Sequence, residues 1–377
     1  MNIVVNTQLL LKDKLEGLGW FTYETLKRIT KAHPEHTFYF VFDRPYDRSF
    51  IFGNHVKPII MRPPSRHPIL WYLRFQWLLP RLLKRLNADV FLSPDGWSTL
   101  HTKVPCVQVI HDINFEHFPH DLPLSIRKYF RYYFPRTARK ASIVATVSQY
   151  SKNDIMNTYQ IPEAKIKVLY NGCNDAFTTQ EETTNQKTRQ IFADGHPYFL
   201  YVGALLPRKN IVRLFQAFEI FKKEDTHNTK LLIVGKKKWW TNEMAAAYES
   251  MHYKTDVVFL GRRSVEELNK LYSAAVALTF VPYFEGFGIP ILEAFNSGTA
   301  VISSNCTSIP EVTGDAALLV DPFNVQEIAR AMKRISNDIE LRTQMVKKAQ
   351  KRTVLFSWDK TAEKLWNCIE MASNKPL

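Results

Sequence analysis

Cysteines, metal-binding patterns and long apolar runs are scarce in this sequence. The four cysteines show no Cys-x-x-Cys spacing and no His/Cys cluster has metal-ligand spacing, so we expect reduced, structural thiols in a cytosolic protein (Cys106, Cys173, Cys306 and Cys368). No apolar run approaches the roughly 18 residues that span a bilayer, and the first charges follow the apolar residues, the reverse of a secretory signal. Asp-x-Asp is absent near predicted strand ends, which argues against a metal-bridged diphosphate site.

The composition that remains is that of a large, basic, globular protein. A chain of 377 residues exceeds one ordinary core and predicts two domains. With 45% hydrophobic and 23% charged residues it is neither disordered nor fibrous. The formal net charge of +14 favours an anionic partner, which would be a phosphorylated small molecule, a nucleic acid or an anionic membrane surface. Solubility alone is the alternative reading of this charge.

Apolar, β-rich runs alternate with helical patterns along the whole chain. Runs that are apolar on both faces and separated by helix-length segments predict an α/β protein with parallel sheets covered on both sides. Strands are predicted at residues 2–6, 37–42, 56–61, 89–94, 105–112, 142–148 and 166–172, and then at 198–203, 230–235, 256–261, 276–282, 300–305 and 317–321.

The alternation pauses at residues 174–197, a polar stretch that we interpret as a linker between two doubly wound domains. This divides the chain into a first domain at 1–180, a second domain at 181–356 and a C-terminal helix at 357–377 that is expected to pack back toward the first domain. The positions expected to form the buried face of that helix are Ala362, Leu365, Trp366, Ile369 and Met371.

Residues 283–305 place two glutamates around a glycine-rich bend. After a predicted strand, "YFEGFG" forms a loop in which Gly286 and Gly288 permit close backbone approach, and Pro290 suits the first turn of a helix over about 290–297. The free amide groups and positive dipole end of such a helix suit a diphosphate. Glu285 and Glu293 could each accept hydrogen bonds from sugar or ribose hydroxyls. The alternative is a pair of acids that only serve the helix dipole.

Two further turns carry candidate residues. "GALLPRKN" follows a predicted strand and holds Arg208 and Lys209, which could neutralise a diphosphate and stabilise the leaving group; a solvated surface pair is the alternative. "VIHDI" places His111 at a strand's carboxyl end, where Asp112 could orient its ring, although a structural histidine is the alternative.

A glycine pair follows the first predicted strand. Gly17 and Gly19 would form a tight loop entering the first helix. The full GxGxxG fingerprint is missing because Thr22 occupies the last glycine's place, so hydride transfer on a dinucleotide is not expected.

The segment "EGFGIPILEAFNSGTAVISSNCTSIPEVTGDAALLVDP" resembles the E-x7-E signature of the retaining nucleotide-sugar glycosyltransferases of family 4. The likeness extends to "YVGALLPRKNIVRLFQAF", "LLIVGKKKWW", "VVFLGRRSVEELNKLYSAA" and "FSWDKTAEKL". In the first half it is confined to "VIHDINFEHFP", "TVSQYSKNDI" and "VLYNGCND". The resemblance implies the GT-B fold, in which two Rossmann-like domains with parallel sheets face each other across a cleft. It further implies that residues 1–180 form the acceptor-side domain and residues 181–356 the nucleotide-sugar-binding domain, and that Gly17 and Gly19 lie near the acceptor and the donor phosphate.

The resemblance also implies roles for the residues of the donor site. The first glutamate of the signature contacts the donor sugar and the second the ribose, which maps onto Glu285 and Glu293, and His111 would donate or accept a hydrogen bond near the reacting carbon. The residues whose backbone would meet the phosphates are Phe287, Gly288 and Ile289.

One departure from the family pattern concerns the turn that begins at Gly203. Many members carry an arginine directly after this glycine, where this chain has Ala204, so the anion-binding role would fall on Arg208 and Lys209. This variant resembles the mannosyltransferase-like branch.

Three residues at neighbouring strand ends are candidates for the nucleobase. Trp239, Trp240 and Arg262 could flank it, and simple packing is the alternative.

Residues 66–86, "RHPILWYLRFQWLLPRLLKRL", mix basic with bulky apolar and aromatic residues. The segment could lie on an anionic membrane, or it could be a core helix with a basic outer face that is broken at Pro80. A lipid-linked acceptor would also explain it.

These observations together predict a retaining, metal-independent hexosyltransferase without a cofactor. It would use a nucleotide diphosphate sugar, GDP-mannose first and a UDP-hexose second, and a glycan or lipid-linked acceptor. We expect a cytoplasmic location with peripheral contact at the inner face of the membrane, and no nucleic-acid partner. The alternatives are a sugar-nucleotide epimerase of the same fold, which needs no acceptor, and an RNA- or polyanion-binding protein suggested by charge alone.

Overall fold

The computed structural model describes residues 1–64, 67–237 and 240–374, and its chain forms two compact units. Unit 1 comprises Met1–Asn171 together with Ser357–Leu377, and unit 2 comprises Gly172–Phe356. The division falls earlier than the predicted 180/181 boundary. The reason is that residues 178 and 180 are already bound to unit 2, where the backbone amides of Thr178 and Gln180 donate to Asn269 and Ser273 at 3.1 and 3.0 Å.

Unit 1 is built on a parallel sheet of seven strands in the order β3-β2-β1-β4-β5-β6-β7. The strand order reverses at β1, between its neighbours β2 and β4. The strands are β1 (Asn2–Asn6), β2 (Thr37–Phe42), β3 (Val56–Ile60), β4 (Val90–Ser93), β5 (Cys106–Val109), β6 (Ile143–Thr146) and β7 (Ile166–Val168).

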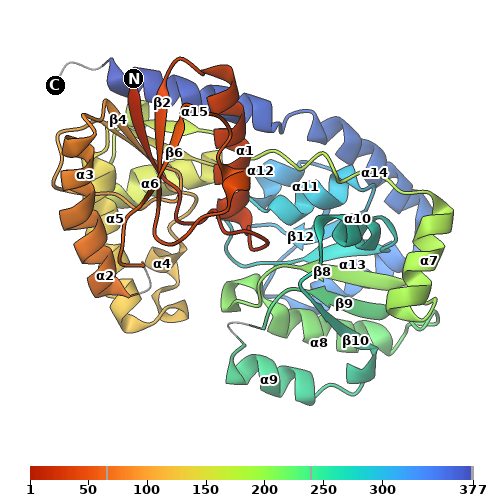
Figure 1. Ribbon diagram of the computed structural model, residues 1–377. Coiled ribbons are helices and arrows are strands. Elements are labelled where there is room, and N and C mark those ends of the chain that lie inside the picture. The colour runs from red at the N-terminus through yellow and green to blue at the C-terminus, as the bar shows by residue number, and fades with distance from the viewer. Residues whose placement is uncertain (65–66, 238–239, 375–377) are drawn as a thin grey trace. The chain divides into compact units, whose positions relative to one another are not determined.

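Helices cover both faces of this sheet (Figure 1). Because crossovers between parallel strands are right-handed, the helices before and after the reversal lie on opposite faces. α1 packs against the C-terminal helix α15, which also contacts β4, β5 and β6. The opposite face carries an apolar cluster contributed by α2, α3, α5 and α6. The helix bounds are α1 (Gly17–Ala32), α2 (Pro68–Tyr72), α3 (Leu79–Arg85), α4 (Asn114–His117), α5 (Leu124–Lys140), α6 (Gln149–Tyr159) and α15 (Trp358–Ser373).

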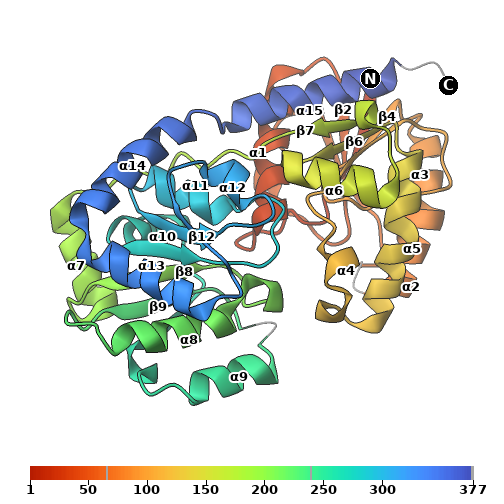
Figure 2. The same ribbon diagram turned by 180° about the vertical axis from the view of Figure 1, so that it is seen from behind.

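Unit 2 repeats the plan with a parallel sheet of six strands in the order β10-β9-β8-β11-β12-β13. Here the order reverses at β8, and Figure 2 shows α8 and α9 on one side of the strands and α10 and α11 on the other. The strands are β8 (Tyr198–Val202), β9 (Lys230–Val234), β10 (Val257–Gly261), β11 (Ala277–Phe280), β12 (Val301–Ser304) and β13 (Leu318–Val320). The helices are α7 (Glu182–Ala193), α8 (Ile211–Lys222), α9 (Asn242–Glu249), α10 (Val265–Ser273), α11 (Ile289–Asn296), α12 (Ile309–Thr313), α13 (Val325–Asn337) and α14 (Ile339–Thr353).

The predicted linker at 174–197 is wrong over half its length, because it contains α7. This helix packs on α10 and β9, yet its buried residues are Asn185, Thr188 and Ala193. A buried face made of small and polar side chains leaves no apolar periodicity in the sequence, which explains why the pattern reads as a linker.

Two other helix predictions need correction. The segment around Pro80 is not broken there, since the π-helical η2 (Leu73–Leu78) joins α2 to α3 and Pro80 lies in the first turn of α3. A proline lacks the amide donor and crowds the preceding turn, and the wider π turn just before it accommodates this. On α15, Met371 is 45% exposed, and Ala372 occupies the buried position expected for it.

Within the described residues, no helix is long and apolar enough to cross a membrane. All four cysteines are free thiols.

Candidate functional site

The turns that follow β8 and β11 lie side by side, because these strands are neighbours at the reversal point of the unit 2 sheet. In open parallel sheets, ligands bind outside the carboxyl ends of the strands at such a point. The Tyr283 amide donates to the Arg208 carbonyl at 3.0 Å, and Asn210 Nδ2 donates to the Val281 carbonyl at 2.9 Å. The two turns predicted to share a ligand are therefore hydrogen-bonded to each other.

Local sequence explains how the first turn presents its cations. Pro207 opens a 3₁₀ turn over Pro207–Lys209, and Asn210 closes it in the left-handed region with φ of 63°. Asparagine tolerates this conformation better than most residues. The turn leaves Arg208 and Lys209 adjacent and directs both toward the turn after β11.

The Glu285 carboxylate binds both cations. Its Oε2 accepts from Arg208 Nη1 at 2.8 Å and also from Lys209 Nζ. All three side chains are mostly buried, with exposed fractions of 14% for Glu285, 17% for Arg208 and 10% for Lys209. Burial raises the pKa of Glu285, but the charges of Lys209 and Arg208 outweigh it, so the pKa lies below its ordinary value. The carboxylate is ionised, and the cluster keeps one net positive charge.

Glu293 lies apart from this cluster and has a different partner. It sits on α11, where its Oε2 accepts from the Tyr272 hydroxyl at 2.7 Å. Burial raises the pKa of Glu293 to about 7. Sequence reasoning missed Tyr272; the only signal was its place within the family-like stretch of α10. The two signature glutamates thus differ in charge behaviour, one firmly ionised and one that titrates near neutral pH.

The entry to α11 follows the prediction closely. Gly288 is the N-cap with φ of 98°, Ile289 and Pro290 form the first turn, and the helix ends at Asn296. The left-handed backbone at position 288 is one that glycine adopts at little cost. The Phe287 ring is buried and packs edge-on against Phe356 at 5.6 Å. The side chain of Phe287 therefore belongs to the core, and contact between its backbone and a phosphate stays a prediction.

Glycines stand at the carboxyl ends of three neighbouring strands of unit 2, where Gly203 follows β8, Gly235 follows β9 and Gly261 is the last residue of β10. The Gly203 amide donates to Val234 and the Gly235 amide to Gly261, both at 2.9 Å. A Cβ on Gly235 would lie 1.9 Å from the Gly203 carbonyl oxygen. The backbone of the turn that begins at Gly203 can adopt its conformation only because residue 235 has no side chain. The sequence analysis did not identify this requirement for a glycine.

The residues proposed to flank a nucleobase are only partly described. Arg262 is exposed just after β10. Trp240 packs against Phe259 and Phe215, with ring centroids 5.7 and 6.3 Å apart. Trp239 lies outside the described residues. These contacts are the packing alternative for Trp240, and a role at the base stays a prediction.

In unit 1, His111 follows β5 and is held by backbone and aromatic contacts. Its Nε2 lies 2.9 Å from the Pro94 carbonyl, which can only accept, so Nε2 carries the proton. The Phe21 ring packs edge-on at 4.8 Å, and burial lowers the pKa of His111. The neutral ring keeps Nδ1 as an acceptor. Asp112 does not orient this ring as predicted, because its carboxylate accepts from the Asn114 amide at 3.0 Å.

The glycine pair lies within a helix and not in the loop before it. Gly17 is the first residue of α1 and Gly19 follows in its first turn. A Cβ on Gly19 would lie 3.0 Å from the Leu9 carbonyl oxygen and 3.1 Å from a Leu15 methyl carbon. Gly19 therefore allows the β1–α1 connection to pack on the start of α1, while contact with a ligand stays a prediction.

A buried polar cluster marks the reversal point of the unit 1 sheet, and sequence reasoning missed it. Asp95, just after β4, accepts hydrogen bonds from Asn6 at 2.9 Å and Gln8 at 2.8 Å, and burial raises the pKa of Asp95.

A second buried polar residue of unit 1 is Arg74, which the sequence analysis also did not identify. The fully buried Arg74 side chain donates to the Met61 carbonyl, whereas its Nε and Nη2 lack a hydrogen-bond partner among the described residues.

One group of potential metal ligands also escaped the sequence analysis. His33, Glu35 and His36 bring ligand atoms within 4.8 Å of one another at the end of α1. The expectation that no histidine cluster has metal spacing was therefore incomplete. This group lies in unit 1 and includes no predicted site residue.

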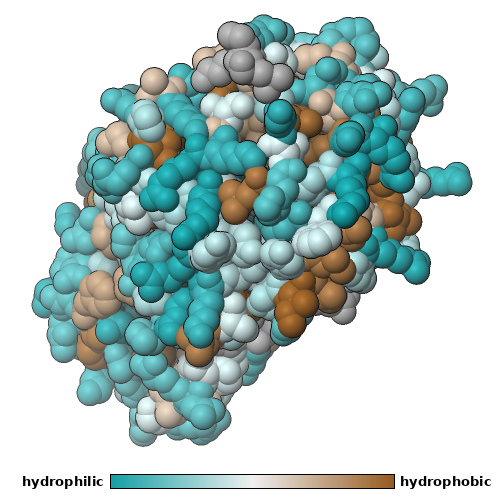
Figure 3. Space-filling model, turned by 90° about the vertical axis from the view of Figure 1, so that its left-hand side faces the viewer, coloured by the Kyte–Doolittle hydropathy of each residue, from teal (hydrophilic) through white to brown (hydrophobic). Residues whose placement is uncertain are grey.

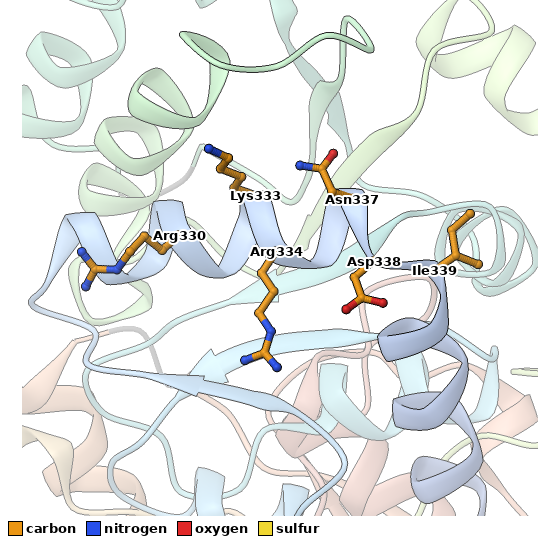
Figure 4. Close-up of a pocket in the computed structure, with 6 residues that line it drawn as sticks. All are labelled: Arg330, Lys333, Arg334, Asn337, Asp338 and Ile339. Carbon is orange, nitrogen blue, oxygen red and sulfur yellow. The ribbon is translucent and has the colours of Figure 1, made fainter.

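A surface hollow of about 590 Å³ in unit 2 lies on α13 and the start of α14. Figure 4 shows its basic and amide side chains spreading in different directions from the helix instead of converging. Its lining residues are Arg330, Lys333, Arg334, Asn337, Asp338 and Ile339, none of which belongs to the predicted site.

Both halves of the chain match family models of glycosyltransferases. A family model described as glycosyl transferases group 1 matches residues 182–352, and one described as glycosyltransferase family 4 matches residues 15–177. The chain is 28% identical to O-antigen chain mannosyltransferase B of Escherichia coli, covering 96% of this chain and 97% of that protein. It is 31% identical to O-antigen chain mannosyltransferase RfbU of Salmonella typhimurium, covering 71% of each.

Solved structures confirm the predicted fold class, GT-B with two doubly wound units. WaaG, a glycosyltransferase involved in lipopolysaccharide biosynthesis, superposes with a TM-score of 0.76 at 18% identity, covering 98% of this chain and 99% of that one. HepE of Anabaena, solved with UDP and glucose, gives the same TM-score, identity and coverage. At this identity the likeness concerns the fold alone.

Proposed function

The chain belongs to family 4 of the glycosyltransferases, and we propose that it moves a hexose from a nucleotide diphosphate sugar to a hydroxyl of a glycan or lipid-linked acceptor. GDP-mannose is the first choice of donor and a UDP-hexose the second. Two relatives that match over most of this chain are named as O-antigen mannosyltransferases, which supports this order. The same likeness favours transfer over the epimerase alternative.

The observation that carries the proposal is the ion-paired cluster of Glu285, Arg208 and Lys209 at the sheet's reversal point. Two adjacent cations can hold a diphosphate, and the start of α11 adds backbone amides and a positive dipole end. Before donor binding, Glu285 offsets one of the two positive charges. When phosphate oxygens take over the cations, this carboxylate becomes an acceptor for sugar hydroxyls.

The chemistry follows from this placement of charge. The bond between the anomeric carbon and the diphosphate oxygen breaks, and the leaving diphosphate keeps the electron pair. Arg208 and Lys209 stabilise the charge that develops there, which is worth roughly 10²–10³ in rate per well-placed donor. The acceptor oxygen bonds to the same face of the anomeric carbon and passes its proton to the leaving phosphate, so the configuration is retained.

We propose that this reaction needs no metal or cofactor, because the side chains already supply the positive charge that a diphosphate requires. Glu293 would bind the ribose hydroxyls through the oxygen that Tyr272 does not occupy. His111 Nδ1 would accept from a sugar hydroxyl, since its Nε2 is held by Pro94. The free thiols fit a reducing, cytoplasmic location.

A donor panel tests the proposal. Purified protein would be incubated with GDP-mannose and several UDP-hexoses, with and without EDTA, and the released nucleotide and the anomeric configuration of the product would be measured. We expect turnover with one donor class, retention, and no loss in EDTA. Glu285→Gln should abolish turnover, whereas Arg330→Gln, at an exposed position of α13, should preserve it. Activity that survives in Glu285→Gln would exclude this site as the reaction centre, and product without any acceptor would instead favour the epimerase.

A further inference from the structure

Two histidines and a glutamate of unit 1, His33, Glu35 and His36, form a compact group of potential metal ligands. Figure 3 shows hydrophilic side chains over much of one face of the molecule, so the nearness of polar groups does not by itself make a site. The side chains around the hollow on α13 diverge, as Figure 4 shows. The group at the end of α1 differs because its ligand atoms converge, all lying within 4.8 Å of one another.

The local sequence explains why these side chains meet. Helix α1 ends at Ala32, and Pro34 disfavours helical backbone at the residue before it. The His36 amide donates to the His33 carbonyl at 3.3 Å, which closes a turn directly before β2 begins. A helix end and a tight turn therefore bring the two imidazole rings together.

One aromatic ring of α15 lies against both imidazoles. The centroid of the Trp366 ring is 3.6 Å from that of His33 and 5.2 Å from that of His36, with interplanar angles of 15° and 18°. The Nδ1 atom of His36 lies 3.2 Å from the Met1 nitrogen, which leaves Nε2 to face Glu35. Contacts of this kind, made by atoms that do not bind the ion, orient the histidines of metal sites.

The distances between the ligand atoms match a tetrahedral zinc site. Glu35 Oε1 lies 3.6 Å from His33 Nδ1 and 3.3 Å from His36 Nε2. Two ligand atoms bound to one Zn²⁺ at bond lengths of about 2.0–2.2 Å lie about 3.4 Å apart in a tetrahedron. Both measured distances are therefore close to those that an ion would impose.

The alternative is that Glu35 only pairs with protonated histidines. One carboxylate cannot neutralise two charged imidazole rings, and the centroids of these rings lie only 6.2 Å apart. Two neutral imidazoles and one carboxylate, in contrast, are a set of ligands that Zn²⁺ binds. Mg²⁺ and Ca²⁺ prefer oxygen ligands throughout, so the two nitrogens select a transition metal.

We propose that His33 Nδ1, Glu35 Oε1 and His36 Nε2 form a binding site for a divalent transition metal ion, best suited to Zn²⁺, with water in the fourth position. The exposed fractions of the three side chains are 26%, 59% and 18%, so an ion can reach them from solvent. This site contains no residue of the donor site, and the proposal does not depend on the proposed function.

An ion at this site would strengthen the contact between α1 and α15. Both histidines that bind it lie against Trp366, and Arg28 of α1 pairs with Asp359 of α15 at 2.5 Å along the same contact. Helix α15 belongs to unit 1, although it follows unit 2 in the chain. Metal binding should therefore oppose the detachment of this last helix from unit 1.

Zinc binding to the full-length protein tests the site directly. Protein stripped of metal would be titrated with Zn²⁺ at pH 8, where free imidazole is unprotonated, in competition with a coloured chelator. We expect one saturable site per chain, and a melting temperature that rises by roughly 5 °C when free Zn²⁺ is about 100 times its dissociation constant. Co²⁺ in place of Zn²⁺ should give the intense visible absorption of a tetrahedral ion.

Two variants separate metal binding from packing. His33→Gln combined with His36→Gln should lose the saturable site, but it also removes two rings that pack on Trp366. Glu35→Gln leaves both rings in place, and the Glu35 side chain is 59% exposed. Without metal this variant should melt like the wild type, yet it should bind Zn²⁺ at least tenfold more weakly.

A matched control removes two histidines outside the group. His227→Gln combined with His252→Gln changes two exposed positions of unit 2 and should bind Zn²⁺ like the wild type. Absence of a saturable site in the wild type, binding that is unchanged in the His33 and Glu35 variants, or an equal loss in the control would overturn the proposal. Donor turnover should be the same in all these variants, so a failure of this site is distinguishable from a failure of the proposed function.

Discussion

Replacing Glu293 with glutamine should remove a pH-dependent loss of stability while weakening donor binding. The pKa of Glu293 is raised by burial from 4.5 to about 7, so the folded chain binds more protons than the unfolded chain between these values. The free energy of unfolding must therefore fall as pH rises through this window. From pH 5 to pH 8 the loss amounts to about 2.5 kcal/mol. Glutamine keeps an oxygen that accepts from Tyr272 but does not titrate.

Urea denaturation of both proteins at a series of pH values gives the measurement. The free energy of unfolding of Glu293→Gln, relative to that of the wild type, should increase by about 2.5 kcal/mol between pH 5 and pH 8, since all other titrating groups are common to both proteins. Affinity for the donor's nucleotide, measured by calorimetry, should fall roughly 10- to 100-fold in the variant, because a charged acceptor is lost. Glu340→Gln, an exposed carboxylate on α14, is the control and should behave as the wild type. Parallel pH curves for Glu293→Gln and the wild type would refute the reasoning.

Three further predictions concern the same unit. Glu285→Gln should lower the free energy of unfolding near neutral pH by roughly 1–3 kcal/mol, because two mostly buried cations lose their counter-charge. This loss of stability should disappear as pH falls through the lowered pKa of the Glu285 carboxyl. Denaturation at several pH values measures both effects. Lys209→Met should reduce kcat by roughly 100- to 1,000-fold in the transfer assay, and a kcat near that of the wild type would contradict its role at the leaving group. Gly235→Ala should prevent folding or cost several kcal/mol because its Cβ would lie 1.9 Å from a carbonyl oxygen, whereas Gly261→Ala, with open space and φ of 68°, should cost roughly 1–2 kcal/mol in thermal melts.

The strands were the most predictable part of the fold. Every predicted run contains a strand of the structure. The central strands are buried on both faces and are therefore apolar throughout, and polar turns bound the runs. The helix α7 was missed because the face it buries is formed by small and polar side chains such as Asn185 and Thr188. The prediction that Met371 is buried was wrong for a related reason. Helical spacing restricts the buried face of a helix to one sector, but it does not determine which residue at the edge of that sector is buried.

The candidate site, like the fold, was only partly predictable from the sequence. Residue types, their spacing and the family resemblance predicted Glu285, Glu293, Arg208 and Lys209 as donor-site residues, because cations and carboxylates at strand ends suit a diphosphate sugar. Spacing could not show that Glu285 would be ion-paired with both cations, nor that Glu293 would share its carboxylate with Tyr272. Those are contacts between elements far apart in the chain, and only packing brings them together.

By itself the sequence determined the class of fold, the order of the strands along the chain and the chemical equipment at their carboxyl ends. These depend on apolar patterning and on residue type, which are local properties. Only the tertiary structure decided the charge state of these side chains. A glutamate is kept ionised at position 285, whereas a glutamate at position 293 titrates near neutral pH. The physical reason is that a carboxyl group's pKa depends on its burial and on the charges that face it, and neither is written in the residues next to it.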